Sequence, residues 1–419
     1  MFLFFFFLLL TVSKPAYAYL DPGSGNALIY VFVSLTGAFF YVVKSLFYRL
    51  VGKEVEQAEP DDGKKLVIFG ENGNYWPVFK TTAERLTERK IRFYYLTTDI
   101  DDPALMVESD YMQPRYIGDG AGAYYKMSHL SADILYTTTP NIGTAGYPIA
   151  RSPNVKKIVF VGHVFGTIEC VWLRKFACDK YDEIIASNDT VEERVRHLEK
   201  IRHLPEKKVC VCGCPYLDVL NDRLKNVSTQ TDGKTVLIGS SWGDKGCLNV
   251  YGTDFIERLA KAGYNVIVRP HPQSLISEKE MIRKYREKLK KYENVSWSFD
   301  VDGIPAMAKS DVMISDVSGV RFDYFALLQR PVLVLEMPEI DLDAYDYGDL
   351  REIMAKFRPE EEMGAVLPKD KIDRIEDVVA GLIKNQKNRN YQEIRDKYAF
   401  NFGRAGRVIA DHLISEMNE

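Results

Sequence analysis

The chain has 419 residues, of which 46% are hydrophobic and 27% charged, and its formal net charge is −4. This length suggests two to three domains, and the composition is that of ordinary globular protein. The acidic balance argues against a nucleic-acid binder, which needs a basic surface to neutralise phosphates. Any anionic ligand must therefore be held by local groups.

Two apolar runs occupy the N-terminal region. Residues 1–18 begin with an apolar stretch and end in Ala16-Tyr17-Ala18, which is typical of a signal-like segment with a cleavage site, although a positive n-region is absent. An uncleaved first membrane segment is the alternative, but the run is short for a bilayer core of about 30 Å.

Residues 19–52 predict a transmembrane anchor. Their apolar run reaches roughly the 20 residues that a membrane-spanning helix needs. Lys44, Arg49 and Lys53 follow this run, and the positive-inside rule places that flank in the cytoplasm. A buried core helix is the alternative, but a polar linker at 53–63 favours the anchor. The sequence therefore predicts a single-pass protein of the cell membrane with a large cytoplasmic body.

From residue 64 onward, short apolar runs alternate with amphipathic stretches, which is typical of parallel α/β architecture. A polar linker at 225–233 separates two such sets, so we expect domains at 64–228 and 229–419. In the first set, strands are predicted at 65–69, 91–96, 132–137, 157–161 and 183–186, and a helix at 77–89.

The second set repeats the pattern and ends in a helix at 406–417, which we expect to pack back on the first half. Its other predicted elements are strands at 235–239, 265–268, 312–315 and 331–335, and helices at 254–262, 277–291 and 319–329. The predicted fold is α/β, with two Rossmann-like doubly wound units facing a cleft and ligands at the carboxyl ends of the strands.

Cys210, Cys212 and Cys214 alternate along the chain, so an extended strand would place them on one face. They are interpreted as small buried apolar groups with free thiols, as in a reducing compartment. A metal site is the alternative, but paired ligands at finger-like spacing are missing.

The segment from Ser315 to Asp323 predicts a phosphate-binding turn. A buried strand ends at Ser315 and a helix starts near Gly319, with Ser318 as its N-cap and Asp316 between them. Gly319 lets the backbone approach a ligand, and the N–H groups of a first helical turn can bind phosphate. A plain strand-to-helix turn with a capping serine is the alternative.

Two histidines also follow predicted strands. His271 lies in Arg269-Pro270-His271-Pro272, where the prolines hold an Arg and a His at a strand's carboxyl end. Arg suits a phosphate, and His can donate to one or carry a proton. His163 follows the strand at 157–161 and is a candidate general base for an acceptor hydroxyl, provided that its pKa lies near neutral. Each histidine has a structural alternative as a packed residue.

These elements, in this order, resemble the CDP-glycerol glycerophosphotransferase family, which builds teichoic-acid-type polymers. The resemblance covers about 158–414 in pieces, while the part before residue 139 matches weakly. The family has Trp-His-Gly-Thr where this chain has Gly162-His163-Val164-Phe165-Gly166-Thr167, and Gly319 stands where a second Ser is common. The matching pieces are Gly213-Cys214-Pro215-Tyr216-Leu217-Asp218, Arg269-Pro270-His271-Pro272, the segment 310–334 and Phe402-Gly403-Arg404-Ala405.

The resemblance implies a GT-B-like transferase that needs no metal or other cofactor. It implies catalytic roles for His163 and His271, and donor binding by Arg269, Asp316, Ser318, Gly319 and Asp323. The expected activity moves glycerol phosphate, or a related polyol phosphate, from a CDP-linked donor to a hydroxyl of a lipid-linked or polymeric acceptor, releasing CMP. The alternatives are a glycosyltransferase that uses a sugar nucleotide and a non-catalytic degenerate scaffold at the membrane.

Overall fold

The computed structural model describes residues 65–163, 165–166, 173–339, 348–356 and 358–418. The predicted signal-like segment, 1–18, and the predicted anchor, 19–52, lie outside these ranges. Among the residues that are described, no helix combines the length and the apolar character needed to cross a membrane. Residues 62–419 form one compact unit, and the domain boundary near 228 stays a prediction.

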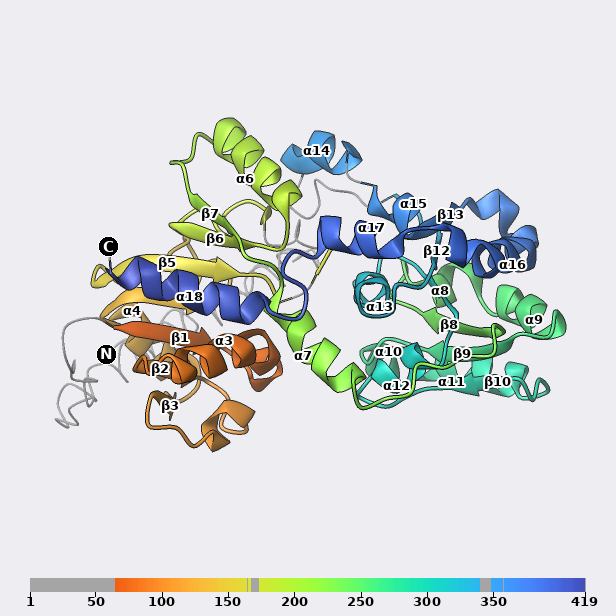
Figure 1. Ribbon diagram of the computed structural model, residues 1–419, viewed down its shortest axis with the longest axis horizontal. Helices are drawn as coiled ribbons and strands as arrows, with labels where there is room; N and C mark the ends of the chain where they lie inside the picture. Colours follow the sequence, from red (N-terminus) through yellow and green to blue (C-terminus); the bar gives the residue numbers. More distant parts are fainter. Residues whose placement is uncertain (1–64, 164, 167–172, 340–347, 357, 419) are drawn as a thin grey trace, which may run out of the picture. The chain divides into compact units, whose positions relative to one another are not determined.

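The first half is built on a seven-stranded, all-parallel sheet with the order β3-β2-β1-β4-β5-β6-β7 (Figure 1). Helices cover both faces, so β1 is an unbroken apolar run and all five of its residues are buried. The strands are β1 (Leu66–Gly70), β2 (Phe93–Thr97), β3 (Met112–Tyr116), β4 (Ala132–Thr137), β5 (Val155–Val161), β6 (Glu183–Ala186) and β7 (Lys208–Val211).

The helical segments of this half lie between the strands in the chain. The predicted helix at 77–89 is α3, which lies one residue earlier in the chain. The edge strand β3 was not predicted because Pro114 interrupts it, and only an edge strand tolerates a proline without losing a ladder bond. The helical segments are η1 (Gly73–Tyr75), α3 (Trp76–Glu88), η2 (Pro103–Met106), α4 (Gly120–Ser128), α6 (Asp189–Arg202) and α7 (Pro215–Leu224).

The second half is built on a six-stranded parallel sheet with the order β10-β9-β8-β11-β12-β13. Strands were predicted at four of these positions, and the short edge strands β10 and β13 were missed. The strands are β8 (Thr235–Gly239), β9 (Asn265–Arg269), β10 (Val295–Trp297), β11 (Val312–Ser315), β12 (Val332–Leu335) and β13 (Gly364–Leu367).

The predicted helix at 277–291 is confirmed as α11, which begins two residues later and ends two residues earlier. Glu278 separates it from the short helix α10, and its carboxylate accepts from the Gly243 amide at 3.1 Å and from the Asn249 side chain at 2.6 Å. The helical segments are α8 (Cys247–Tyr251), α9 (Asp254–Lys261), α10 (Ser274–Ser277), α11 (Lys279–Leu289), α12 (Ile304–Ala308), α13 (Val320–Leu328), η5 (Gly348–Leu350), α14 (Arg351–Lys356), α15 (Pro359–Met363), η6 (Lys369–Arg374), α16 (Ile375–Asn385), η7 (Gln386–Asn388), α17 (Tyr391–Tyr398) and α18 (Ala405–Asn418).

The terminal helix α18 packs against α3 of the first half, as the sequence predicts (Figure 1). Asp218 fixes its beginning, because this carboxylate accepts from the amides of Ala405 at 3.1 Å and Gly406 at 2.8 Å. A Cβ atom at Gly406 would overlap the Thr81 side chain, so only glycine allows this close approach.

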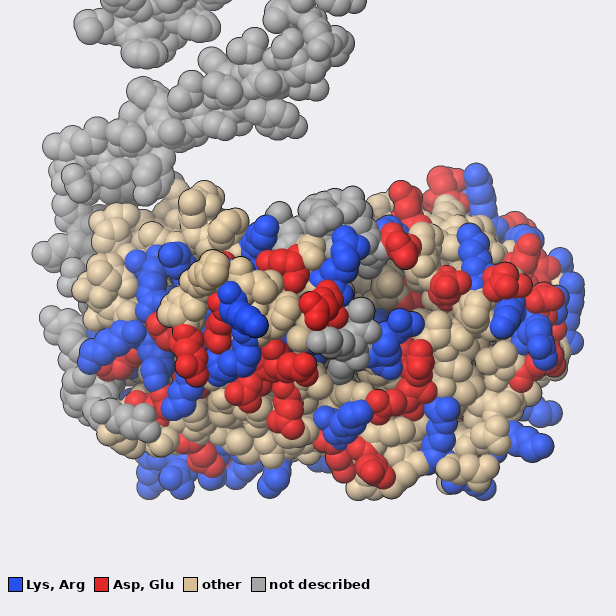
Figure 2. All heavy atoms as spheres, turned by 90° about the horizontal axis from the view of Figure 1, so that it is seen from above, with Lys and Arg blue, Asp and Glu red and all other residues tan. Residues whose placement is uncertain are grey.

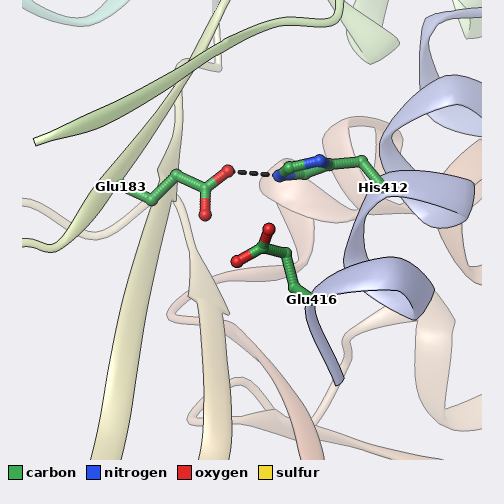
Figure 3. A group of neighbouring side chains, drawn as sticks. All are labelled: Glu183, His412 and Glu416. Atoms are coloured by element: carbon green, nitrogen blue, oxygen red, sulfur yellow. Dashed lines mark hydrogen bonds and ion pairs between the residues drawn. The ribbon is translucent and has the colours of Figure 1, made fainter. Parts of the chain in front are cut away.

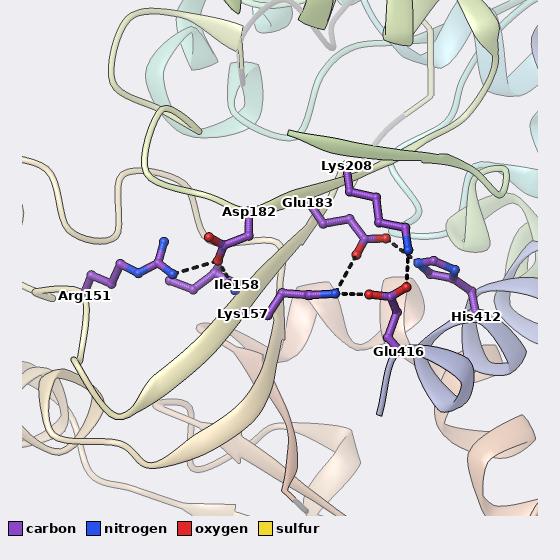
Figure 4. A network of polar contacts seen from close by, with 8 residues as sticks. All are labelled: Arg151, Lys157, Ile158, Asp182, Glu183, Lys208, His412 and Glu416. Carbon is purple, nitrogen blue, oxygen red and sulfur yellow. Dashed lines mark hydrogen bonds and ion pairs between the residues drawn. The ribbon is translucent and has the colours of Figure 1, made fainter. Parts of the chain in front are cut away.

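The other end of α18 is held by buried charges (Figures 3 and 4). His412 contacts the carboxylate of Glu183 at the start of β6, and Glu416 pairs with Lys157 and Lys208 from β5 and β7. The two buried carboxylates are matched by two ammonium groups, so the cluster satisfies its own charge. This cluster fixes the position of α18 along the sheet.

The cysteine prediction is partly wrong. Cys210 and Cys212 form a disulfide with each other, so they are neither free thiols nor metal ligands. Cys214 is a buried free thiol, as predicted. The strand β7 ends at Val211, so the extended backbone that would align all three sulfurs stops before Cys212.

Candidate active site

Three neighbouring strands of the second sheet bring most of the predicted donor-site residues together. Gly239 at the end of β8 pairs with Arg269 of β9 on one side and with Ser315 of β11 on the other. Because these strands are parallel, the segments that follow them, 240–246, 270–273 and 316–319, emerge at the same edge. The sequence placed His271 and the 316–319 turn at strand ends, and the sheet order makes them neighbours.

Asp316 organises this edge. Both of its carboxylate oxygens accept from the Ser241 amide, at 3.1 and 2.9 Å, and the Cys247 amide donates to Oδ2 at 2.7 Å. Oδ1 also accepts from the Ser318 amide at 2.9 Å. Backbone N–H groups therefore surround this fully buried side chain, and it ties the loop after β8 to the turn after β11. Its predicted contact with the donor stays a prediction, and the structure gives it a positioning role.

The turn at Ser318 and Gly319 differs from the predicted cap. The helix α13 begins at Val320 with Gly319 as its N-cap, so the prediction that Ser318 caps it is wrong. The Ser318 carbonyl instead accepts from the guanidinium of Arg321 at 2.7 Å, and Glu360 pairs with the same buried guanidinium at 3.0 Å. Arg321 therefore fixes the position of the turn through the Ser318 carbonyl, and Glu360 balances its charge. Sequence reasoning missed this role.

Arg269 and His271 are both half-buried at this edge. The Arg269 guanidinium donates to the Ser298 hydroxyl at 3.0 Å and to the Val301 carbonyl at 3.2 Å, and burial lowers its pKa. His271 Nδ1 accepts from the Gln273 amide at 3.1 Å, so the neutral ring carries its proton on Nε2. Burial lowers the pKa of His271, against the opposing charges of Asp316 and Glu278. A neutral imidazole with Nε2–H can donate to a phosphate oxygen.

Asp323 lies on the buried side of α13. Its Oδ1 is buried and has no hydrogen-bond partner, and burial raises the pKa of the carboxyl to about 7. Burial, and then the charge of Asp323, raise the pKa of Tyr216 in α7, which marks the two side chains as neighbours. Asp323 therefore belongs to the packing between α13 and α7, behind the turn, and its predicted donor role stays a prediction.

His163 stands at the carboxyl edge of the first sheet, directly after β5. Its Nδ1 lies 3.3 Å from the Thr138 hydroxyl, and its ring lies 4.9 Å from the Tyr75 ring, between centroids. Burial lowers the pKa of His163 to about 4, so the ring is neutral near pH 7. This pKa lies below the near-neutral value that the prediction required, because the ring is buried. The neutral imidazole can still accept a proton, which a general base must do.

The turn that follows His163 contacts the helix that begins at the donor-side turn. The rings of Phe165 and Phe322 meet edge to face with centroids 6.2 Å apart. Gly166 has a φ of +100° and a Cβ atom there would overlap the Phe322 ring. Phe322 lies in α13, just after the turn at Ser318 and Gly319. This contact therefore joins the segment after His163 to the helix that follows that turn.

Sequence reasoning also missed side chains beside His163. Glu71, Tyr75 and Thr138 all lie near the ends of β1 and β4, the strands next to β5 in the sheet. The signal was available, because the strands at 65–69 and 132–137 were predicted, and the residues after them belong to the edge where ligands bind.

Comparison with known proteins decides the family. The model of the family described as CDP-Glycerol:Poly(glycerophosphate) glycerophosphotransferase matches residues 171–414. The chain belongs to this family. That match contains Arg269, His271 and the turn at 316–319, and it begins after His163. No curated protein sequence matches the chain.

Solved structures show that the two-sheet fold of this chain is GT-B-like, as in the wall teichoic acid polymerase TagF. The wall teichoic acid polymerase TagF is 16% identical, covers 91% of this chain and 98% of its own, and has a TM-score of 0.52. UDP-GlcNAc 2-epimerase from Neisseria meningitidis is also 16% identical, covers 84% and 100%, and has a TM-score of 0.55. A glycosyltransferase from Rickettsia africae ESF-5 is 12% identical, covers 85% and 99%, and has a TM-score of 0.51. At these identities the likeness concerns the fold alone.

Proposed function

We propose that this family member transfers glycerol phosphate, or a related polyol phosphate, from a CDP-linked donor to an acceptor hydroxyl and releases CMP. The observation that carries the proposal is the family match over 171–414, because that segment contains Arg269, His271 and the turn at 316–319. A variant of TagF was solved after soaking with CDPG, and it shares the fold at a TM-score of 0.54.

The proposed reaction begins at His163. In this scheme the Nδ1–H donates to the Thr138 hydroxyl, which lies 3.3 Å away, and Nε2 takes the proton of the acceptor hydroxyl. The acceptor oxygen then forms a bond to the glycerol-bearing phosphorus, while the bond from that phosphorus to the CMP oxygen breaks. One proton moves to His163 and CMP leaves with the electron pair.

The second sheet stabilises the departing charge in this scheme. His271 donates from Nε2, Arg269 supplies positive charge, and the amide of Gly319, the N-cap of α13, faces the pyrophosphate. Because Asp316 and Arg321 fix that turn in advance, little reorganisation is needed during the reaction. Acidic and basic side chains are interspersed on the face drawn in Figure 2.

Isothermal titration with CMP, CDP-glycerol and a UDP-sugar tests the donor class. We expect binding of the two cytidine ligands and a loss of at least tenfold in affinity for Ser318→Arg, which fills the turn with a long side chain. Ser228→Arg is the matched control, because it adds the same charge at an exposed position. Binding of the UDP-sugar alone would replace the proposal with glycosyl transfer.

We also propose that residues 19–52 tether the enzyme to the cell membrane with its body in the cytoplasm. The support is the apolar run at 27–43 and the basic residues after it. A tether would raise the local concentration of a lipid-linked acceptor. Membrane fractionation of the full chain and of residues 63–419 tests this: recovery of both in the soluble fraction would contradict it.

A further inference from the structure

A group of half-buried polar side chains has no part in the proposed chemistry, and one of its members contacts the ring of His163. It consists of Glu71, Tyr75 and Tyr147, here called the acceptor cluster. Phe69 of β1 is in register with Thr137 of β4, and Thr137 with Phe160 of β5. Glu71 therefore leaves the sheet at the same edge as His163, two strands away.

The backbone that carries Glu71 is held in place by the neighbouring strand end. The Thr98 hydroxyl donates to the Glu71 carbonyl at 2.5 Å, and the Gly73 amide donates to the Asp99 carboxylate at 3.0 Å. A Cβ atom at Gly73 would come within 2.9 Å of the Asp102 backbone, so the loop is closely packed. The carboxylate is thus presented by a fixed loop, as a binding residue requires.

The three side chains of the acceptor cluster are close enough to influence one another. Burial raises the pKa of Glu71, and the Thr139 hydroxyl partly opposes that rise. Burial and then the charge of Glu71 raise the pKa values of Tyr75 and Tyr147. Tyr75 also contacts the ring of His163, so the cluster extends to the proposed base.

Within the described residues, no lysine or arginine charge acts on the pKa of Glu71, which burial raises. A carboxylate of this kind accepts hydrogen bonds from hydroxyl groups and repels phosphate. Tyrosine rings add an apolar face, and their hydroxyls add hydrogen bonds, which together suit a polyol or a sugar.

We propose that Glu71, Tyr75 and Tyr147 form a subsite for an uncharged, hydroxyl-rich acceptor terminus and hold its attacking hydroxyl toward His163. This inference rests on the proposed transfer to a hydroxyl and adds the chemical class of the group at the reacting end. Any phosphate of the acceptor lies away from Glu71, because the two negative charges repel.

The test is the variant Glu71→Gln, which keeps the shape of the side chain and removes its charge. CMP release from CDP-glycerol is measured with glycerol and methyl glucoside as neutral acceptors and glycerol 3-phosphate as an anionic one. We expect the KM for neutral acceptors to rise about tenfold or more, since hydrogen bonds to a charged group are lost. The KM for CDP-glycerol stays within twofold, and the preference for glycerol over glycerol 3-phosphate falls by about the same factor as the neutral KM rises.

Glu108→Gln is the matched control, because Glu108 is an exposed carboxylate of the same half. Unchanged acceptor KM values and unchanged preference in Glu71→Gln would overturn the subsite. Saturation-transfer NMR with glycerol and methyl glucoside measures the subsite without turnover, and absence of a signal from wild-type protein would also overturn it. Failure to bind CDP-glycerol would instead contradict the proposed function.

Discussion

The two histidines of the candidate site occupy corresponding positions after a strand, yet their surroundings differ. At His271 a backbone amide donates to Nδ1, which fixes the proton on Nε2. At His163 the partner of Nδ1 is the Thr138 hydroxyl, which can accept or donate. Burial lowers the pKa of both rings. The sheet edge with His271 therefore presents a fixed hydrogen-bond donor, while the edge with His163 can present a base.

Removal of the proposed base has the largest expected effect. His163→Ala should lower kcat with CDP-glycerol about 10³-fold, because general base catalysis contributes on that scale. The affinity for CMP should not change, since His163 lies on the other sheet. His129→Ala is the control, because that histidine is exposed in the same half. Turnover within threefold of wild type would remove His163 from the mechanism.

Removal of the fixed donor comes next. His271→Ala should lower kcat about 10²-fold, since one electrostatic donor to a developing charge is lost. In contrast to His163→Ala, this variant should also bind CDP-glycerol more weakly, which isothermal titration measures. If both variants gave the same pattern of kcat and donor affinity, the distinction between base and donor would be wrong.

The pH dependence of kcat/KM checks the state of the base. Burial lowers the pKa of His163 to about 4, and only the unprotonated ring can accept a proton. As the pH is lowered from 7, kcat/KM should therefore stay constant until about pH 4. Below about pH 4 it should fall about tenfold per pH unit. An acid limb near pH 6.5 would show a solvated histidine or another base.

The smaller variant Thr138→Val sharpens the same point. It removes the hydroxyl that is the partner of Nδ1, so the ring is no longer held in the tautomer that the proposed base needs, with the proton on Nδ1. We expect kcat to fall about tenfold, the scale of one lost hydrogen bond. CMP affinity should stay as in wild type. Thr144→Val provides the comparison, since its hydroxyl bonds the Asn141 carbonyl instead.

The substitution Asp323→Asn in α13 should have the smallest effect on activity and a measurable effect on stability. Burial raises the folded pKa of Asp323 to about 7, above its ordinary value. The unfolded chain therefore releases this proton first, and wild-type stability falls as pH rises from about 4 to 7. Asp323→Asn is neutral throughout, so the variant does not lose this stability. Its free energy of unfolding minus that of wild type should therefore be about 2 kcal/mol larger at pH 8 than at pH 5. Urea unfolding at both pH values measures this, and a difference independent of pH would contradict it.

Some of this molecule could be predicted from residues that are near one another in the chain. The predicted bounds of β4, β6, β8 and β11 agree with the structure, because a strand buried on both faces is a continuous apolar run. His271 was found in the same way, since prolines next to a strand end are a local signal. The beginning of α13 was not, because Arg321 and Asp316 define that turn through partners elsewhere.

The sequence by itself therefore determined the alternating strands and helices, the two parallel sheets and the family to which the chain belongs. Only the tertiary structure decided which side chain does what at the strand ends. Asp316 finds its partners about seventy residues earlier in the chain, at Ser241 and Cys247. Burial and the charge of Glu71 raise the pKa of Tyr147, which lies far along the chain from Glu71. The physical reason is that hydrogen bonds, burial and pKa shifts depend on distance in space, which the local pattern of a chain does not contain.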